Sequence, residues 1–168
     1  MKDAGADVIQ IDEPQMAAHP IEARRHGIAA IDEALDGIEG TTVVHMCFGY
    51  GYVVAEKPSG YVFLLELDKC CAQAISIEAA ELGFDPAILA ELPSKQVLYG
   101  VFNLGDETVE TPKIIAGRLR GALQYIWPDR LIAEPDCGIK YLPRAVAYGK
   151  LKAMVAGAQI VRNEVAAP

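Results

Sequence analysis

Short apolar runs alternate along this chain with longer segments whose apolar residues recur at helical spacing. Five of the runs contain β-branched residues and predict strands at residues 8–13, 41–47, 74–78, 97–103 and 131–137. Each begins with apolar residues, and most lead into Gly or Pro. This pattern is typical of strands that are buried on both faces of a parallel sheet.

Helical patterns separate the predicted strands. The series Ile21, Ile28, Ile31 and Leu35 follows helical spacing and stops before Gly37, which predicts a first helix that ends there. A strand–helix alternation repeated about five times indicates a parallel α/β fold, either a barrel or a doubly wound sheet. Because composition is even from end to end, we expect no domain boundary.

The other predicted helices carry recognisable start signals. Thr111 followed by Pro112 predicts an N-cap and first turn, and Asp85 followed by Pro86 predicts a shorter helix. A last helix is predicted over 142–161. The apolar positions of the helix after Thr111 and of the last helix are Ile115, Leu119, Leu123, Val146, Leu151, Met154 and Val155.

Composition and charge limit the class of protein. The 168 residues are 52% apolar, enough for one domain or a part of one, and the net charge is -8. An acidic chain has little to offer a phosphate backbone, so we expect neither nucleic acid nor an anionic membrane as partner. The N-terminus lacks the pattern of a signal peptide, and no apolar run reaches the roughly 20 residues that span a bilayer. We therefore expect a cytoplasmic protein.

Residues with metal-binding chemistry gather at the carboxyl ends of the predicted strands, where barrels and open α/β sheets both build their sites. His45 and Cys47 are two residues apart, so a strand would present both on one face. That pair alone is a weak signal, because buried His and Cys are common in cores. Cys137 and Glu78 end two other strands, and two thiols, an imidazole and a carboxylate match zinc.

A second carboxylate competes with Glu78 for this role. Glu66 lies closer in sequence to His45 and Cys47. The spacing of residues 61–71 is helical, however, which would place Glu66 on a helix that faces away from the strand ends. We expect Cys70 and Cys71 to pack that helix.

Five motifs, in this order, carry a family resemblance: IDEP at 11–14, HMCFG at 45–49, ISIE at 75–78, GVFN at 100–103 and PDCGIK at 135–140. Together they resemble the catalytic barrel of cobalamin-independent methionine synthase, most closely its short, single-barrel members. The resemblance covers essentially the whole chain. It implies a (β/α)₈ barrel with zinc held by the ligands His45, Cys47, Glu78 and Cys137.

The resemblance also implies a reaction and its substrates. A zinc-bound thiol is deprotonated yet remains a nucleophile. In the family, the homocysteine thiolate attacks the methyl group of 5-methyltetrahydrofolate, and Glu78 is the ligand most easily displaced by an incoming thiol. Asp12 matches the acid that holds the amino group of homocysteine, although an Asp before Pro14 is also suited to cap a helix. Glu13 is a further candidate substrate contact.

The chain departs from the family pattern in two places. IDEP corresponds to about the fourth strand of the family's barrel, so residues 1–168 would be its C-terminal part, with strands four to eight. We expect the open edges to be covered by a separate N-terminal half or in a homo-oligomer. After GVFN, the segment LGDETVETP has no His where long methionine synthases have one, which leaves Asp106 and Glu107 as candidate proton donors.

Two other functions are compatible with the same residues. One is zinc-dependent alkyl transfer to another thiol, as in the epoxyalkane to coenzyme M transferases. The other is a non-catalytic zinc-binding fragment or subunit that assembles with a partner.

Overall fold

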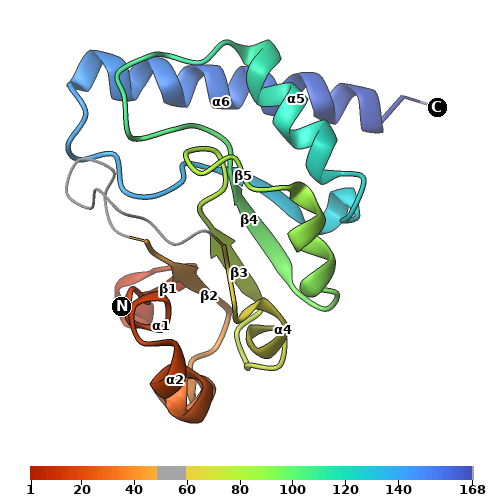
Figure 1. Cartoon of the computed structure of the whole chain (residues 1–168). Helices are drawn as coiled ribbons and strands as arrows, with labels where there is room; N and C mark the ends of the chain where they lie inside the picture. The colour runs from red at the N-terminus through yellow and green to blue at the C-terminus, as the bar shows by residue number, and fades with distance from the viewer. Residues whose placement is uncertain (49–59, 168) are drawn as a thin grey trace.

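One parallel sheet of five strands organises the chain (Figure 1). The computed structural model describes residues 1–48 and 60–167. The strands lie in the order in which they occur in the sequence: β1 (Val8–Asp12), β2 (Thr41–Met46), β3 (Ala74–Ile77), β4 (Gln96–Gly100) and β5 (Leu131–Glu134). A doubly wound sheet reverses its strand order at a switch point, whereas this order runs in one direction. The structure therefore confirms the α/β class and selects the barrel-type arrangement.

The middle of the sheet is the most deeply buried part of the fold. All four residues of β3 are buried, as are five of the six in β2. Their side chains are mostly β-branched or small, which suits strands covered on both faces. The register places Asp12 beside His45 and His45 beside Ser76.

Each predicted strand runs too far at its C-terminal end. Cys47, Glu78 and Cys137 follow β2, β3 and β5 and lie outside the strands. Beyond the strand ends, backbone groups form hydrogen bonds with side chains instead of with a neighbouring strand. The Phe48 N–H, for example, donates to Glu78 Oε1 over 2.9 Å. The candidate ligands other than His45 thus sit on loops. Gly49, in the HMCFG motif, is outside the described residues.

The first helical region is interrupted, contrary to the continuous helix predicted. It consists of α1 (Gln15–Ala18), α2 (Pro20–Glu22), a π-helical segment η2 (Ala23–Gly27) and α3 (Ile28–Leu35). Pro20 has no N–H and begins a new helix, and the wider π turn changes the angular position of later residues. Ile31 and Leu35 are buried as predicted, but Ile21 is 64% exposed.

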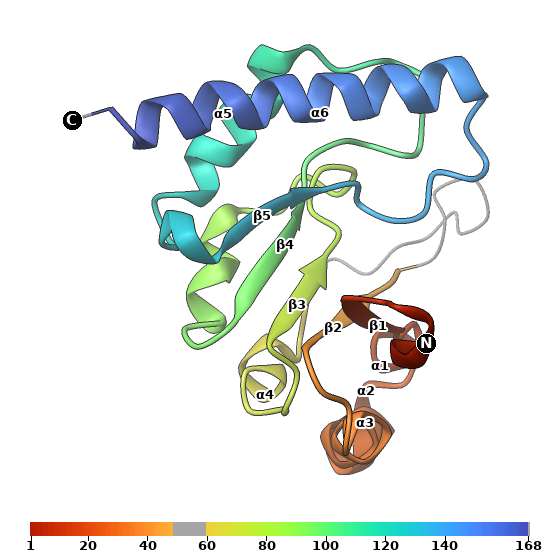
Figure 2. The same cartoon turned by 180° about the vertical axis from the view of Figure 1, so that it is seen from behind.

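The remaining helices are α4 (Leu64–Leu67), the 3₁₀ helices η3 (Pro86–Glu91) and η4 (Pro128–Arg130), α5 (Pro112–Ala122) and α6 (Arg144–Val165), with η1 (Lys2–Ala4) at the N-terminus. Among them, α5 and α6 are the longest and pack against each other. Figures 1 and 2 show α5 and α6 at one end of the sheet and α1 to α3 at the other. No helix within the described residues has both the length and the apolar character to cross a membrane.

Local capping follows the predicted signals, whereas the last helix is displaced. Asp85 accepts from the Ala87 N–H, and Thr111 Oγ1 accepts from the Ile114 N–H. The helix predicted over 142–161 instead begins at Arg144 and ends at Val165. Val155, predicted on its apolar stripe, is 65% exposed and lines an apolar groove beside β5.

Candidate metal centre

Four side chains converge where β2, β3 and β5 end. The ligand atoms of His45, Cys47, Glu78 and Cys137 all lie within 4.8 Å of one another. His45 is part of β2, and the other three lie in the loops that follow the strands. His45, Cys47 and Glu78 are buried, and Cys137 is partly buried. The structure thus brings together all four residues predicted as zinc ligands.

The two sulfur atoms have a separation that suits a shared metal ion. Sγ of Cys47 lies 3.6 Å from Sγ of Cys137, and neither cysteine forms a disulfide. A disulfide would bring the sulfurs to about 2.05 Å. Two thiolates at about 2.3 Å from a tetrahedral zinc lie about 3.8 Å apart. The observed distance is close to the second arrangement.

The electrostatics of the cluster also favour a cation. The pKa of Cys137 is raised because it shares a hydrogen bond with Cys47 and because it is partly buried. Burial lowers the pKa of His45, but Cys47, Glu134 and Glu78 raise it by more, so the net shift is upward. Two thiolates and a carboxylate at this spacing would repel one another, so Cys137 keeps its proton unless a positive charge is present. The donor set fits zinc.

Hydrogen bonds fix the backbone around Glu78. The Tyr61 hydroxyl accepts the Glu78 N–H over 2.7 Å, and it lies 3.1 Å from the Glu78 carbonyl and 3.4 Å from that of Met46. Burial raises the pKa of Tyr61 well above its usual value, so the hydroxyl keeps its proton and can donate to a carbonyl. Tyr61 thereby ties the ends of β2 and β3 together.

Asp136 connects the loop of Cys137 to the loop of Glu78. It is fully buried, and its carboxylate accepts the backbone N–H groups of Ala79, Ala80 and Glu81 at 3.2, 3.0 and 2.6 Å. Gly100 makes room for it, since a Cβ there would meet Asp136 Oδ1 at 2.0 Å. The sequence analysis missed this role of Asp136, although its place beside Cys137 in PDCG was a usable signal.

Glu134 is a second carboxylate, partly buried, whose role was not predicted from the sequence. Ser76 donates its hydroxyl proton to Glu134 Oε1, and Ser76 Oγ lies 2.5 Å from Nδ1 of His45. Burial raises the pKa of Glu134 to about 7, although the Ser76 hydrogen bond and His45 act in the opposite direction. Its position at the end of an apolar strand was the only sequence signal available.

The predicted substrate residues lie beside the cluster and differ in their contacts. Burial raises the pKa of Asp12, and the charge of Cys47 adds to the shift. Glu13 Oε1 accepts the N–H groups of Gln15 and Met16 at 2.7 and 3.0 Å, so Glu13 caps α1. The capping role considered for Asp12 therefore belongs to its neighbour.

The predicted proton donors lie on an exposed part of the loop after β4. Asp106 Oδ1 accepts the Thr108 N–H over 2.7 Å, and both Asp106 and Glu107 are exposed. The loop is anchored nearby by a buried ion pair: Lys150 Nζ lies 3.0 Å from Glu110 Oε2. Glu110 Oε1 also accepts the Asn103 N–H. Neither Asp106 nor Glu107 belongs to the four-residue cluster.

Other residues weighed from the sequence lie away from the cluster. Glu66 lies 3.9 Å from Arg24 in an exposed ion pair and is not among the four clustered ligands. Cys70 is buried as expected, but Cys71 is exposed, because it follows α4 on a surface turn where its N–H donates to Asp32.

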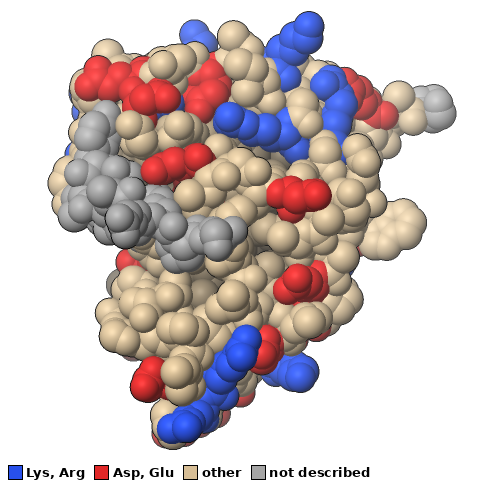
Figure 3. Space-filling view, viewed as in Figure 1, with Lys and Arg blue, Asp and Glu red and all other residues tan. Residues whose placement is uncertain are grey.

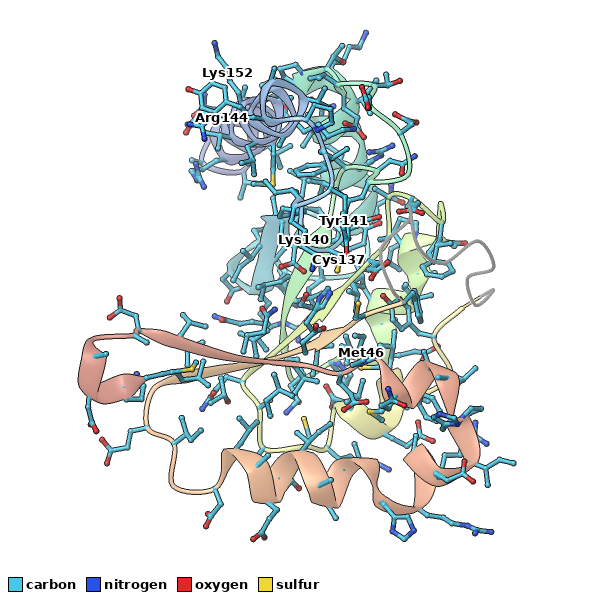
Figure 4. All side chains as sticks on the ribbon, turned by 90° about the vertical axis from the view of Figure 1, so that its left-hand side faces the viewer. Met46, Cys137, Lys140, Tyr141, Arg144 and Lys152 are labelled. Carbon is cyan, nitrogen blue, oxygen red and sulfur yellow. The ribbon has the colours of Figure 1, made fainter. Side chains whose placement is uncertain are left out.

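Charged side chains elsewhere form no continuous basic surface on the face shown in Figure 3, where acidic and basic groups are interspersed. Figure 4 shows Lys140 and Tyr141 on the same loop as Cys137, whereas Arg144 and Lys152 project from α6. Lys140 Nζ lies 5.0 Å from the centre of the Tyr141 ring. Both residues are exposed, as expected for a solvated turn.

Comparisons with known proteins agree on one family. The family model described as the catalytic domain of cobalamin-independent synthase matches residues 1–160. The chain is 34% identical to a methionine synthase of Sulfurisphaera tokodaii and 36% identical to one of Thermococcus kodakarensis, over 97% and 96% of its own length. These alignments cover 45% and 46% of the two relatives, so the chain spans about half their length.

A solved structure has the same fold. It is a B12-independent methionine synthase from Shewanella sp. W3-18-1 in complex with selenomethionine. The TM-score is 0.91 at 32% sequence identity, and the match covers 98% of this chain and 51% of the other.

Proposed function

Because this chain belongs to the family of cobalamin-independent synthase catalytic domains, we propose that it forms the zinc-binding part of an enzyme that transfers a methyl group to the thiol of homocysteine. The observation that carries the proposal is the convergence of His45, Cys47, Glu78 and Cys137 within 4.8 Å. We further propose that the methyl donor is 5-methyltetrahydrofolate and that the protein acts in the cytoplasm, where thiols stay reduced.

Zinc bound by these residues would lower the pKa of a substrate thiol, so that a thiolate is available at neutral pH. The protein's part is to hold the site and to give it one exchangeable position. Glu78 suits that position, because its Oε1 already accepts the Phe48 N–H at 2.9 Å. If the Glu78 carboxylate left the metal, it would still accept the hydrogen bond from the Phe48 N–H.

Asp12 is the residue that we propose for the amino group of homocysteine. It lies beside His45 in the strand register, and a hydrogen bond with Cys47 contributes to its raised pKa. An ammonium group next to Asp12 would favour the ionised carboxylate and lower that pKa again. Glu13 supports this end of the site by capping α1, and any substrate contact it makes is additional.

Asp106 or Glu107 would supply the proton for the departing folate. Both are exposed acids on the loop that follows β4, at the edge of the sheet where the cluster lies. The buried pair of Lys150 and Glu110 fixes the base of this loop. This role requires Asp106 or Glu107 at the tip of the loop to reach the bound folate.

Further β/α units would complete the fold around the site. Two apolar grooves adjoin the edge strands: one contains Ile132 of β5 with Met154 and Val155 of α6, the other Ile11 of β1 with Met16. The relatives are about twice as long as this chain. We propose that residues 1–168 are the C-terminal part of a barrel and that its other strands cover both grooves.

Metal analysis tests the centre. We expect the purified chain to bind one zinc ion, and Cys47→Ser or Cys137→Ser to weaken binding by more than about 100-fold, since even indirect supports of metal ligands are worth 10- to 100-fold. Cys71→Ser removes an exposed thiol and is the matched control. Wild-type protein without stoichiometric zinc, or equal affinity in all variants, would exclude the proposed site.

Complementation tests the reaction. The zinc-loaded chain is mixed with the unmatched part of the T. kodakarensis relative, and methionine formation from homocysteine and 5-methyltetrahydrofolate is measured. We expect turnover only in the mixture, together with a 1:1 complex in native mass spectrometry. No turnover with homocysteine or with coenzyme M, under conditions in which the intact relative is active, would contradict the proposal and indicate a non-catalytic zinc protein. Alkylation of coenzyme M instead of homocysteine would reassign the acceptor.

A further inference from the structure

A chain of hydrogen bonds runs from the metal centre through three strands. Nδ1 of His45 on β2 lies 2.5 Å from the hydroxyl of Ser76 on β3, and that hydroxyl bonds to Oε1 of Glu134 on β5. Ser76 is fully buried and His45 is 5% exposed. Nε2 of His45, the other ring nitrogen, is buried and has no hydrogen-bond partner within the described residues.

The direction of these hydrogen bonds determines which nitrogen of His45 has a lone pair. A serine hydroxyl has only one proton, and an ionised carboxylate accepts but cannot donate. When Ser76 donates to Glu134, its oxygen must accept a proton from Nδ1 of His45. The neutral imidazole then carries its lone pair on Nε2, the nitrogen left for a metal.

We propose that Ser76 and Glu134 are positioning residues that hold His45 in the ring orientation and tautomer required for metal binding. The inference rests on the proposed function in that the metal is taken to be zinc. Neither residue belongs to the four-residue cluster, so each would act through His45. Without Ser76, the ring would be free to place its proton on either nitrogen and to rotate, and part of the affinity for zinc would be lost.

Two measurements on the full 168-residue chain test this role. Zinc affinity is measured by competition with a chromophoric chelator. The His45 tautomer of the metal-free chain is read from ring ¹⁵N chemical shifts at a pH above the raised pKa values of both Glu134 and His45, where the carboxylate is ionised and the ring is neutral. We expect Ser76→Ala to weaken zinc binding by about 10- to 100-fold and to replace the single Nδ1–H tautomer by a mixture.

Matched variants separate positioning from general stability. Ser76→Thr keeps the hydroxyl and should restore the wild-type tautomer. Thr42→Val removes another buried hydroxyl, bonded to Gln73, and should leave zinc affinity within about twofold. Glu134→Gln can donate as well as accept, so we expect a mixed tautomer there also.

The results for Ser76→Ala and Glu134→Gln either support the proposal or overturn it. Wild-type tautomer and affinity in Ser76→Ala would overturn it, and an unchanged single tautomer in Glu134→Gln would remove Glu134 from it. If Ser76→Ala fails to fold, Ser76→Thr and Glu134→Gln still report the tautomer. A wild-type chain that binds no zinc but shows the Nδ1–H tautomer would refute the proposed function while supporting this hydrogen-bond order.

Discussion

The metal centre and the loop after β4 both depend on buried charged groups, but only the loop is paired with basic side chains. The ammonium group of Lys150 on α6 lies 3.0 Å from Glu110 of the loop, and Arg118 on α5 lies 3.5 Å from the same carboxylate. At the metal centre, two thiols and several carboxyl groups gather around the imidazole of His45, and the pKa values of Cys137, Glu134 and Asp136 are all raised. The first arrangement stabilises a loop, whereas the second would be completed by the proposed zinc ion.

The largest effect is expected from breaking the buried pair in the loop. Lys150→Met leaves Glu110 buried, and loss of one partner of a buried ion pair costs about 3 to 5 kcal/mol. We expect the free energy of unfolding to fall by about 3 kcal/mol, near the lower limit, because Arg118 remains close to Glu110. Chemical denaturation measures the change. Lys152→Met, at an exposed position of the same helix, should change it by less than about 0.5 kcal/mol.

The folded chain should lose stability as pH rises, because partial burial raises the pKa of Glu134 to about 7. An exposed glutamate has a pKa of about 4.3, so the folded state binds this proton more tightly. The resulting stability is fully present below about pH 4.3 and is lost as pH rises through 7. The full shift would be worth about 3.7 kcal/mol, which the partial solvent exposure of Glu134 reduces to about 2 to 3 kcal/mol.

Glu134→Gln isolates that contribution. In the metal-free chain, the free energy of unfolding of the wild type should fall relative to Glu134→Gln between about pH 5 and pH 8. Denaturation curves at both pH values give the difference. A constant difference would mean that Glu134 has an ordinary pKa.

A smaller effect is expected at Asp136, which joins the two ligand loops. Asp136→Asn keeps the shape but turns an amide donor toward one of three backbone N–H groups, at a cost of about 1 to 2 kcal/mol. Zinc affinity should fall as well, since Cys137 and Glu78 would no longer be held together. Calorimetric melting and chelator competition measure the two changes. Asp129→Asn, on an exposed turn, is the control, and equal effects in both variants would contradict the role of Asp136.

The difference between the two regions also explains what the sequence could predict. Parallel strands place their C-terminal ends at one edge, so motif residues such as His45 and Glu78 could be assigned to one site from order alone. Ser76 and Glu134 could not, because their partners are set by register across three strands. Lys150 and Glu110 are 40 residues apart and meet only through the packing of α6. The break in the helical series between Ile21 and Ile28 could not be predicted, because a π turn leaves no reliable sequence pattern.

The smallest effect on stability, and the clearest on function, is expected at the exposed acids of the loop. Asp106 accepts only exposed, local hydrogen bonds, from the Thr108 N–H and from Nδ2 of Asn103, and Glu107 is exposed. Asp106→Asn and Glu107→Gln should therefore each change the free energy of unfolding by less than about 0.5 kcal/mol. Neither belongs to the metal cluster, so zinc affinity should stay the same.

If one of them protonates the departing folate, its variant should slow methyl transfer in the complemented enzyme by about 100-fold or more, because general acids contribute factors of that order. Turnover numbers for the two variants, with Asp129→Asn as the control, would identify the donor. Equal rates in all of them would show that the loop holds the fold together without taking part in the chemistry.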